Sequence, residues 1–171
     1  KEGDEIIMSS RTFIATASSA VLLGAIPIFA DVEKESGNIS TKKIEGLISK
    51  RTKAIVAVHL GGWPADMVKI NALAKEYNLY VIEDCAQAHG AQIDGVSVGS
   101  FGNVAAWSFC QDKIMTTAGE GGMVTTSNQE IWNYIWSYKD HGKDFNTVFK
   151  KNHPPGYRWL HNTFGTNYRM T

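Results

Sequence analysis

The sequence predicts a three-layer α/β/α fold built on a doubly wound, mostly parallel sheet. Short apolar runs of about five residues alternate with amphipathic stretches of about ten, which is typical of strands joined by crossover helices. The segment Lys53–His59 is apolar almost throughout. A strand of this kind is buried on both faces, so we expect helices on both sides of the sheet.

Cap and turn residues divide the first half of the chain into alternating strands and helices. Gly24 should end the first helix in a left-handed conformation, whereas Ser40 and Asp66 should cap the next two helices. The third helix should bury a stripe that runs from Ile70 to Tyr77. The expected strands are Glu5–Ser9, Ile26–Ala30, Lys53–His59 and Leu79–Ile82, and the expected helices are Thr16–Leu23, Thr41–Lys50 and Met67–Tyr77.

The second half of the chain has fewer regular elements. Asp94-Gly95 predicts a small hairpin within Ala91–Val98. Trp132 and Trp136 lie at helical spacing, and we expect them in the core. Lys143–Phe164 is polar and aromatic without periodicity, so it predicts a long loop. The remaining expected elements are strands at Val104–Phe109 and Met123–Thr126 and a helix at Asn128–Lys139.

Composition excludes several classes of protein. Lys plus Arg and Asp plus Glu both number 17 among the 171 residues, so the chain lacks the basic excess of nonspecific nucleic-acid binders. No apolar run is long enough to cross a membrane, and no secretory signal is visible. Cys85 and Cys110 form neither a disulfide framework nor a zinc pattern, which favours the reducing cytosol. The chain starts at Lys1 and ends at Thr171 without clear boundaries, so we expect it to be a piece of a longer protein.

The stretch Trp107–Gly122 suggests a site with a reactive lysine. Lys113 comes shortly after a predicted buried strand and before the turn Ala118–Gly122, which contains three glycines. Open α/β proteins build their sites at the carboxyl ends of the strands, and glycines let a ligand approach the backbone. Lys113 in this place is suited to attack a carbonyl carbon. The alternative is an ordinary solvated loop lysine.

A second group of polar residues lies at the end of the predicted strand Leu79–Ile82. Asp84 ends this strand, and Gln87 lies about one helical turn further on. An aspartate and a lysine on opposite sides of one pocket suit pyridoxal phosphate, because the carboxylate keeps the pyridine nitrogen protonated while the amine binds the cofactor carbonyl. Gln87 is placed to bind the ring hydroxyl. The alternative is that Asp84 only caps the segment after its strand.

The other candidates are weaker. His59 ends a strand and either faces the pocket or is structural. Gly119–Gly122 precedes a strand and not a helix, so it is no dinucleotide-binding fingerprint. Cys85 and Cys110 flank the proposed site but are more typical of small buried side chains. The remaining histidines, His89, His141, His153 and His161, lack the spacing of metal ligands, and we expect no metal site.

The two polar stretches resemble the nucleotide-sugar aminotransferases of the DegT/StrS type, which belong to the fold type I pyridoxal-phosphate enzymes. The most specific similarities are the run from Glu83-Asp84 to Gly90 and the run from Ser108-Phe109 through Lys113 to Gly122. Shorter similarities lie at Gly3–Ile7, Thr12-Phe13, Gly24-Ala25, Lys53–Leu60 and Asn167–Met170. The resemblance implies that residues 1–142 cover most of the cofactor-binding large domain and that residues 143–171 lead toward a small domain.

The resemblance also implies a role for each matching residue. Lys113 would hold the cofactor covalently and act as the catalytic base and acid. Asp84 would pair with the pyridine nitrogen and Gln87 with the ring oxygen. The remaining implied cofactor contacts are Ser108 with the phosphate, Phe13 stacked on the ring, and Asn167 with the phosphate in the neighbouring subunit of a homodimer. Ordinary packing is the alternative for Phe13, and an ordinary strand hydroxyl is the alternative for Ser108.

The sequence departs from the family at two places. Cys110-Gln111-Asp112 stands where many members have His-Pro or a similar pair before the lysine, which affects the substrate side of the pocket. Members also have an upstream phosphate-binding turn and a downstream small domain that are not in this sequence. Related dehydratases replace the lysine with histidine, and Lys113 argues against that branch.

The resemblance implies a cytoplasmic ping-pong aminotransferase. Pyridoxal phosphate would be its cofactor and glutamate its amino donor, and a nucleotide-linked keto-deoxysugar for cell-surface polysaccharide would be its substrate. We expect a homodimer with shared active sites and neither nucleic acid nor membrane as a partner. The alternatives are a non-catalytic piece that serves as a dimerisation scaffold, and a sugar dehydratase that uses the same cofactor.

Overall fold

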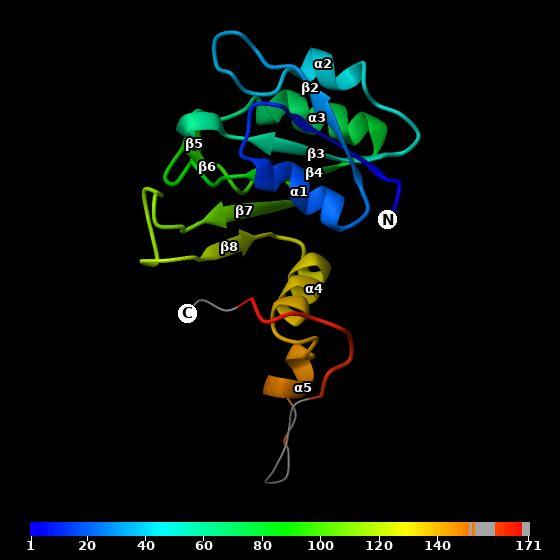
Figure 1. Ribbon diagram of the computed structural model, residues 1–171, viewed down its shortest axis with the longest axis vertical. Helices are drawn as coiled ribbons and strands as arrows, with labels where there is room; N and C mark the ends of the chain where they lie inside the picture. Colours follow the sequence, from blue (N-terminus) through cyan, green and yellow to red (C-terminus); the bar gives the residue numbers. More distant parts are fainter. Residues whose placement is uncertain (151, 153–159, 169–171) are drawn as a thin grey trace.

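A six-stranded, mostly parallel sheet forms the centre of the computed structural model, which describes residues 1–150, 152 and 160–168 (Figure 1). Five strands run parallel, and β8 pairs antiparallel with β7 at one edge. The spatial order is β2 (Ile26–Ala30), β1 (Glu5–Ser9), β3 (Thr52–Val58), β4 (Tyr80–Asp84), β7 (Val104–Ser108) and β8 (Gly122–Thr125). The predicted mostly parallel sheet is confirmed.

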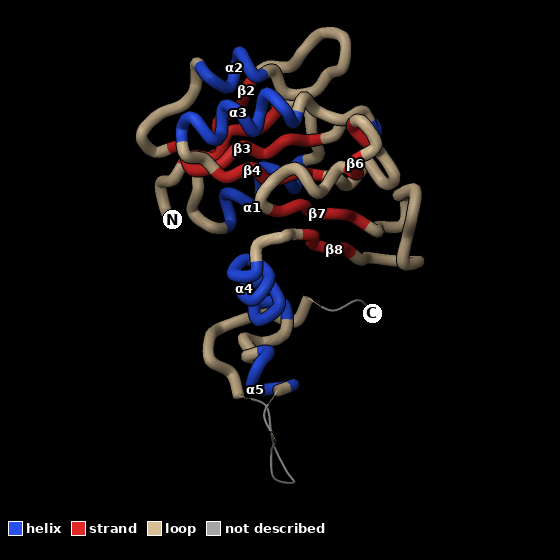
Figure 2. Tube along the Cα trace, turned by 180° about the vertical axis from the view of Figure 1, so that it is seen from behind, coloured by secondary structure: helices blue, strands red, loops and turns tan. Residues whose placement is uncertain are grey.

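Helices cover the two faces of this sheet. Helix α1 (Ile14–Leu22) packs on one face, and α2 (Thr41–Glu45) and α3 (Met67–Tyr77) pack on the other, as Figures 1 and 2 show from opposite sides. Successive residues of a strand point to opposite faces. Thus Ile7 joins the cluster under α3, whereas Met8 joins the cluster under α1. This alternation of buried side chains produces the three predicted layers.

Capping interactions fix where the main helices begin and end. The Asp66 carboxylate accepts a hydrogen bond from the Lys69 backbone N–H at 3.1 Å, as predicted for the start of α3. Gly24 has φ +74°, and the next N–H bonds back to the Ala20 carbonyl at 3.0 Å, which ends α1 in a left-handed turn. Ser40 precedes α2, but its side chain makes no capping hydrogen bond.

The predicted hairpin is present beside the main sheet. β5 (Gln92–Ile93) and β6 (Val96–Ser97) pair antiparallel across Asp94 and Gly95, whose φ angles are +50° and +80°. Positive φ at both central residues is the geometry of a type I′ turn, which Asp-Gly favours.

Three expectations about the helices were wrong in part. The helix predicted over Thr41–Lys50 ends at Glu45, and Tyr77 is 40% exposed at the end of α3. Trp132 and Trp136 do not enter the core, since α4 (Gln129–Lys139) has no buried residue. Their rings instead pack against Phe145 of α5 (Phe145–Phe149), a helix within the expected long loop. Pro154 and Pro155 of that loop lie outside the described residues.

No helix within the described ranges is long and apolar enough to cross a bilayer. This finding agrees with the absence of a membrane-length apolar run in the sequence.

Candidate active site

Most of the predicted site residues lie at one edge of the sheet, where its parallel strands end. Phe13 follows β1, Gln87 follows β4, and Lys113 belongs to the segment between β7 and β8. β4 and β7 are adjacent, with Asp84 opposite Ala106 and Ser108 two residues further along β7. Open parallel sheets bind ligands at this edge. The structure therefore confirms that these strand ends are neighbours.

The carboxylate of Asp84 is held at both oxygens. Its Oδ2 accepts a hydrogen bond from the Thr16 hydroxyl at 2.8 Å, and its Oδ1 accepts one from the Ala86 N–H at 3.1 Å. The Ala86 bond is the local turn expected of an aspartate after a strand. The Thr16 bond links β4 to α1, so Asp84 is oriented by a second element besides its own turn.

Gln87 is oriented in the same region. Its side-chain oxygen accepts a hydrogen bond from the Gly61 N–H at 2.7 Å, in the short helix η1 (Leu60–Gly62) after β3. Because the oxygen is the accepting atom, the NH₂ group is the end that can donate to a ligand oxygen. This orientation fits the predicted contact with a ring oxygen.

Lys113 is not an ordinary solvated lysine in this structure. Only 22% of its side chain is exposed. Its Nζ lies 3.7 Å from the Asp112 carboxylate, which is too long for a hydrogen bond. Its backbone N–H bonds to the Cys110 carbonyl at 3.1 Å, which makes a turn after the strand. The side chain is thus mostly buried, and its amine makes no short ion pair with Asp112.

The other three predicted site residues, Ser108, Phe13 and Asn167, lie in different surroundings. Ser108 is half-buried at the end of β7, and its hydroxyl accepts only a long bond, 3.4 Å, from the Cys110 N–H. Phe13 precedes α1 and is 71% exposed, so it does not pack in the core of the described chain. Asn167 is exposed and pairs with Asp140 after α4.

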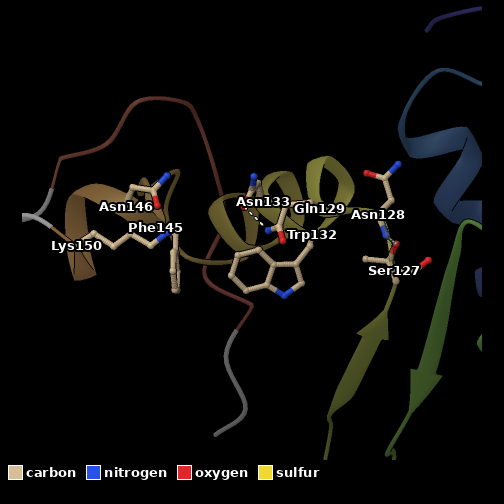
Figure 3. A pocket seen from close by; sticks show the side chains of 9 residues that line it. Ser127, Asn128, Gln129, Trp132, Asn133, Phe145, Asn146 and Lys150 are labelled. Atoms are coloured by element: carbon tan, nitrogen blue, oxygen red, sulfur yellow. Dashed lines mark hydrogen bonds between the residues drawn. The ribbon is translucent and has the colours of Figure 1, made fainter.

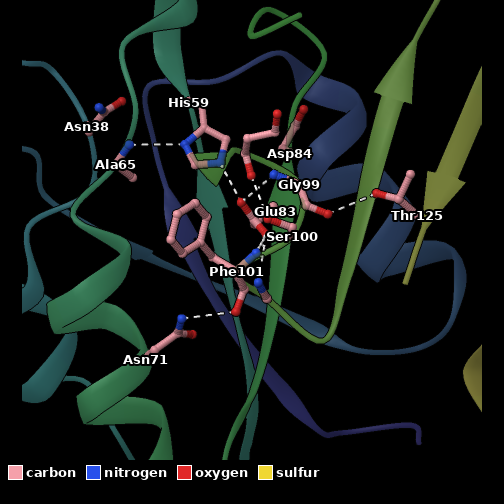
Figure 4. Close-up of polar contacts among 12 residues, drawn as sticks. Asn38, His59, Ala65, Asn71, Glu83, Asp84, Gly99, Ser100, Phe101 and Thr125 are labelled. Carbon is pink, nitrogen blue, oxygen red and sulfur yellow. Dashed lines mark hydrogen bonds and ion pairs between the residues drawn. The ribbon is translucent and has the colours of Figure 1, made fainter. Parts of the chain in front are cut away.

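His59 does not face a pocket. It is fully buried, its Nε2 lies 3.0 Å from Glu83, and its Nδ1 accepts the Ala65 N–H at 3.0 Å (Figure 4). Since Nδ1 is an acceptor, the ring proton lies on Nε2 and is donated to Glu83. Glu83 also accepts from the N–H groups of Gly99, Phe101 and Gly102 at 2.7, 2.8 and 2.6 Å. His59 is thus a structural residue.

These hydrogen bonds bear on whether His59, Glu83 and Cys85 could hold a metal ion. The ligand atoms of His59, Glu83 and Cys85 lie within 4.8 Å of one another. However, both nitrogens of the imidazole and both oxygens of the carboxylate already have protein partners. The pKa of the Cys85 thiol is raised, mainly by burial and further by the negative charges of Glu83 and Asp84. The raised pKa disfavours the thiolate that would bind a metal ion.

Two hollows lie beside α4. One, of about 560 Å³, lies between α4 and α5 and is lined by Trp132, Phe145 and Lys150, among others (Figure 3). The other, of about 650 Å³ and mostly apolar, lies between β8 and α4. Neither is lined by Asp84 or Lys113. The second hollow nevertheless shares Trp107 and Gly121 with the stretch that contains Lys113.

The comparisons with known proteins agree with this geometry. The model of the DegT/DnrJ/EryC1/StrS aminotransferase family matches residues 1–171. The chain belongs to this family. An aminotransferase structure from Psychrobacter cryohalolentis is 60% identical, with a TM-score of 0.96, and the match covers 99% of this chain and 43% of that one. The fold is thus that of the large domain of fold type I aminotransferases.

Two curated relatives are also similar over much of the chain. The UDP-N-acetyl-3-dehydro-alpha-D-glucosamine 3-aminotransferase of Acidithiobacillus ferrooxidans is 49% identical over 140 residues, which are 82% of this chain and 38% of that protein. The GDP-perosamine synthase of Escherichia coli O157:H7 is 42% identical over 170 residues, 99% of this chain and 44% of that protein. The chain therefore spans less than half the length of these relatives.

The residues at the sheet edge fit the cofactor of this family, pyridoxal phosphate. Asp84 offers an oriented carboxylate, Gln87 an amide NH₂ end, and Lys113 an amine on a mostly buried side chain. The exposed ring of Phe13 is available for stacking. An acid, a hydrogen-bond donor, an amine and an aromatic ring are the groups that this cofactor requires.

Sequence reasoning missed two contacts that orient these groups. Thr16 was expected only as the start of a helix, and Gly61 only as part of a loop, yet they hold Asp84 and Gln87. The signal that the sequence did offer for Thr16 is its position three residues, about one helical turn, after Phe13. The partner of Thr16 is 68 residues away in sequence. No local pattern could identify that pairing.

Proposed function

We propose that the full-length protein is a pyridoxal-phosphate aminotransferase that transfers an amino group from glutamate to a nucleotide-linked keto-deoxysugar. Family membership supports the reaction class, and both curated relatives act on or produce sugars linked to nucleotides, as their names state. The observation that supports it most directly is the oriented Asp84 on the same sheet edge as the shielded Lys113.

Each residue has a role that follows from its chemistry. When bound, pyridoxal phosphate supplies an electron sink that stabilises negative charge on the carbon next to nitrogen. Asp84 holds a proton on the pyridine nitrogen by its negative charge. The Lys113 amine would hold the cofactor covalently at its carbonyl carbon, with loss of water, and once displaced by the amino donor it would take a proton from the α-carbon of that donor.

The remaining residues bind and orient. Gln87 donates its NH₂ group to the ring oxygen, and Phe13 covers one face of the ring. Ser108 donates its hydroxyl to the phosphate. Asn167 binds the phosphate in the partner subunit of a homodimer. Sedimentation of the full-length protein as a monomer would contradict this last assignment.

The domain division is part of the proposal. We assign residues 1–142 to the cofactor-binding large domain and residues 143–171 to the connection toward the small domain. In the described chain, α5 interrupts this connection.

Cofactor binding by the lysine tests the first step. Addition of pyridoxal phosphate to the full-length protein should give a yellow absorption band, and the band should be absent in Lys113→Ala and present in Lys53→Ala. Lys53 is a suitable control because it lies in β3 and is exposed. A band that persists in Lys113→Ala would contradict the assignment, and absence of the band in the unchanged protein would favour the scaffold alternative.

Product analysis distinguishes the amine-transfer reaction from dehydration. With glutamate and a panel of nucleotide-linked keto-sugars, mass spectrometry should detect a product that has gained an amino group. A keto-deoxy product without added nitrogen would instead indicate the dehydratase alternative.

A further inference from the structure

Two threonines form a hydrogen-bonded series that ends at Asp84. The hydroxyls of Thr12 and Thr16 lie 2.8 Å apart, and the Thr16 hydroxyl lies 2.8 Å from Oδ2 of Asp84. Both threonines are only partly exposed. The series runs from the segment before α1, through its first turn, to the end of β4.

The direction of the series follows from the donors available. An ionised carboxylate can only accept, so the single proton of the Thr16 hydroxyl points to Asp84. Thr16 can then only accept from Thr12, which is therefore the donor. Hydrogen bonds arranged in this way polarise one another, so the Thr12 bond strengthens the bond that Thr16 gives to the carboxylate.

The same turn also positions Phe13. Phe13 lies between the two threonines along the chain, and its carbonyl accepts the Thr16 N–H at 3.1 Å. The ring that faces solvent and the hydroxyl that holds the acid are thus separated by one helical turn. A shift of this turn would move both at once.

The other oxygen of Asp84 is held by the N–H of Ala86 within its own turn. That local bond holds the carboxylate only relative to its own turn. The bond from Thr16 holds it relative to α1, which lies in the neighbouring layer of the fold. A hydrogen bond to a charged group is also stronger than one between neutral groups.

We propose that Thr16 is a positioning residue of the active site, which orients the Asp84 carboxylate for the pyridine nitrogen and receives support from Thr12. This inference rests on the proposed function, because it requires Asp84 to bind the cofactor. Thr16 acts through Asp84 and not by contact with the reacting atoms.

The test is the dissociation constant of pyridoxal phosphate, measured by equilibrium dialysis with the full-length protein. Thr16→Val removes the hydroxyl at nearly constant shape and should weaken binding roughly tenfold, the size expected for a bond to a charged group. Thr16→Ser keeps the hydroxyl and should restore binding. The matched control is Ser18→Ala, since Ser18 is exposed on the same helix and bonds only to the Ala15 carbonyl.

A double-mutant cycle tests whether Thr16 acts through the acid. In an Asp84→Ala background, Thr16→Val should cause no further loss, because the acceptor is gone. Equal losses in both backgrounds, or failure of Thr16→Ser to restore binding, would overturn the inference and indicate packing. If Asp84→Ala itself leaves the dissociation constant unchanged, the proposed function fails at that residue. If Asp84→Ala weakens binding but Thr16→Val does not, only the role of Thr16 is refuted.

Discussion

Glu83 and Asp84 are neighbours on β4, and their side chains point to opposite faces of the sheet. Glu83 is fully buried among four hydrogen-bond donors, whereas Asp84 lies at the strand-end site and bonds to Thr16. The donors to Glu83 come from the residue after β3 and from the loop after β6, so its carboxylate ties both segments to the end of β4 (Figure 4). Adjacent acids thus have different functions, one structural and one proposed for binding.

The pKa of Glu83 leads to a pH-dependent prediction. Burial opposes its ionisation, but the hydrogen bonds from His59, Gly102 and Gly99 outweigh burial and lower its pKa below the ordinary value of 4.5. A carboxyl whose pKa is lower in the folded state stabilises the fold above its unfolded pKa, and this stabilisation is lost as the pH falls through the folded value.

We therefore expect Glu83→Gln to lower the free energy of unfolding by roughly 3 kcal/mol at pH 7, because its NH₂ group would face other donors. The difference from the unchanged protein should shrink below about pH 4.5. Urea unfolding of the full-length protein, from pH 7 to below about pH 4.5, measures this difference in the free energy of unfolding. Glu76→Gln on the exposed side of α3 is the control, and a loss independent of pH would contradict the explanation.

At the residue scale, the sequence predicted where the proposed site residues lie better than it predicted the contacts that hold them. Asp84 and Lys113 were predictable because each follows a buried strand, and strand ends share an edge. The buried state of His59 was not predictable, since its partners Glu83 and Ala65 come from different segments. Phe13 was left open between stacking and core packing, and its 71% exposure argues against the core.

At the element scale, helix α3 shows how a cap residue sets a boundary. Asp66 accepts the Lys69 N–H, and Asn78 ends the helix in a left-handed conformation with φ 55°. The strands and helix α3 were predicted to within a few residues because these signals are local, whereas α2, whose predicted cap Ser40 makes no capping hydrogen bond, ends five residues early. Helix α4 lies where the sequence predicted it, but the prediction that its tryptophans lie in the core was wrong. Helical spacing of apolar residues does not specify what covers them.

The cap of α3 gives a second stability prediction. Asp66→Ala should lower the free energy of unfolding by about 1 kcal/mol, because the Lys69 N–H loses its partner. Asp66→Asn retains an accepting oxygen and should lose much less. Chemical denaturation of the full-length protein compares the two variants. Equal losses would show that the charge of Asp66, and not the cap, is responsible.

At the scale of the whole molecule, the order of the strands creates the candidate site. β1, β3, β4 and β7 run parallel, so residues far apart in sequence meet where these strands end (Figure 1). The doubly wound arrangement was predictable from the alternation of strands and helices. The position of Asn167 beside Asp140 was not predictable, because it depends on the segment after α4.

The account depends on one covalent contact, between the cofactor and the amine of Lys113. Borohydride reduction of the full-length protein with pyridoxal phosphate, followed by peptide mapping, tests it most directly. We predict that the reduced cofactor is found on the peptide that contains Lys113 and is absent from all other lysines. Labelling of another lysine, with Lys113 unmodified, would contradict the account.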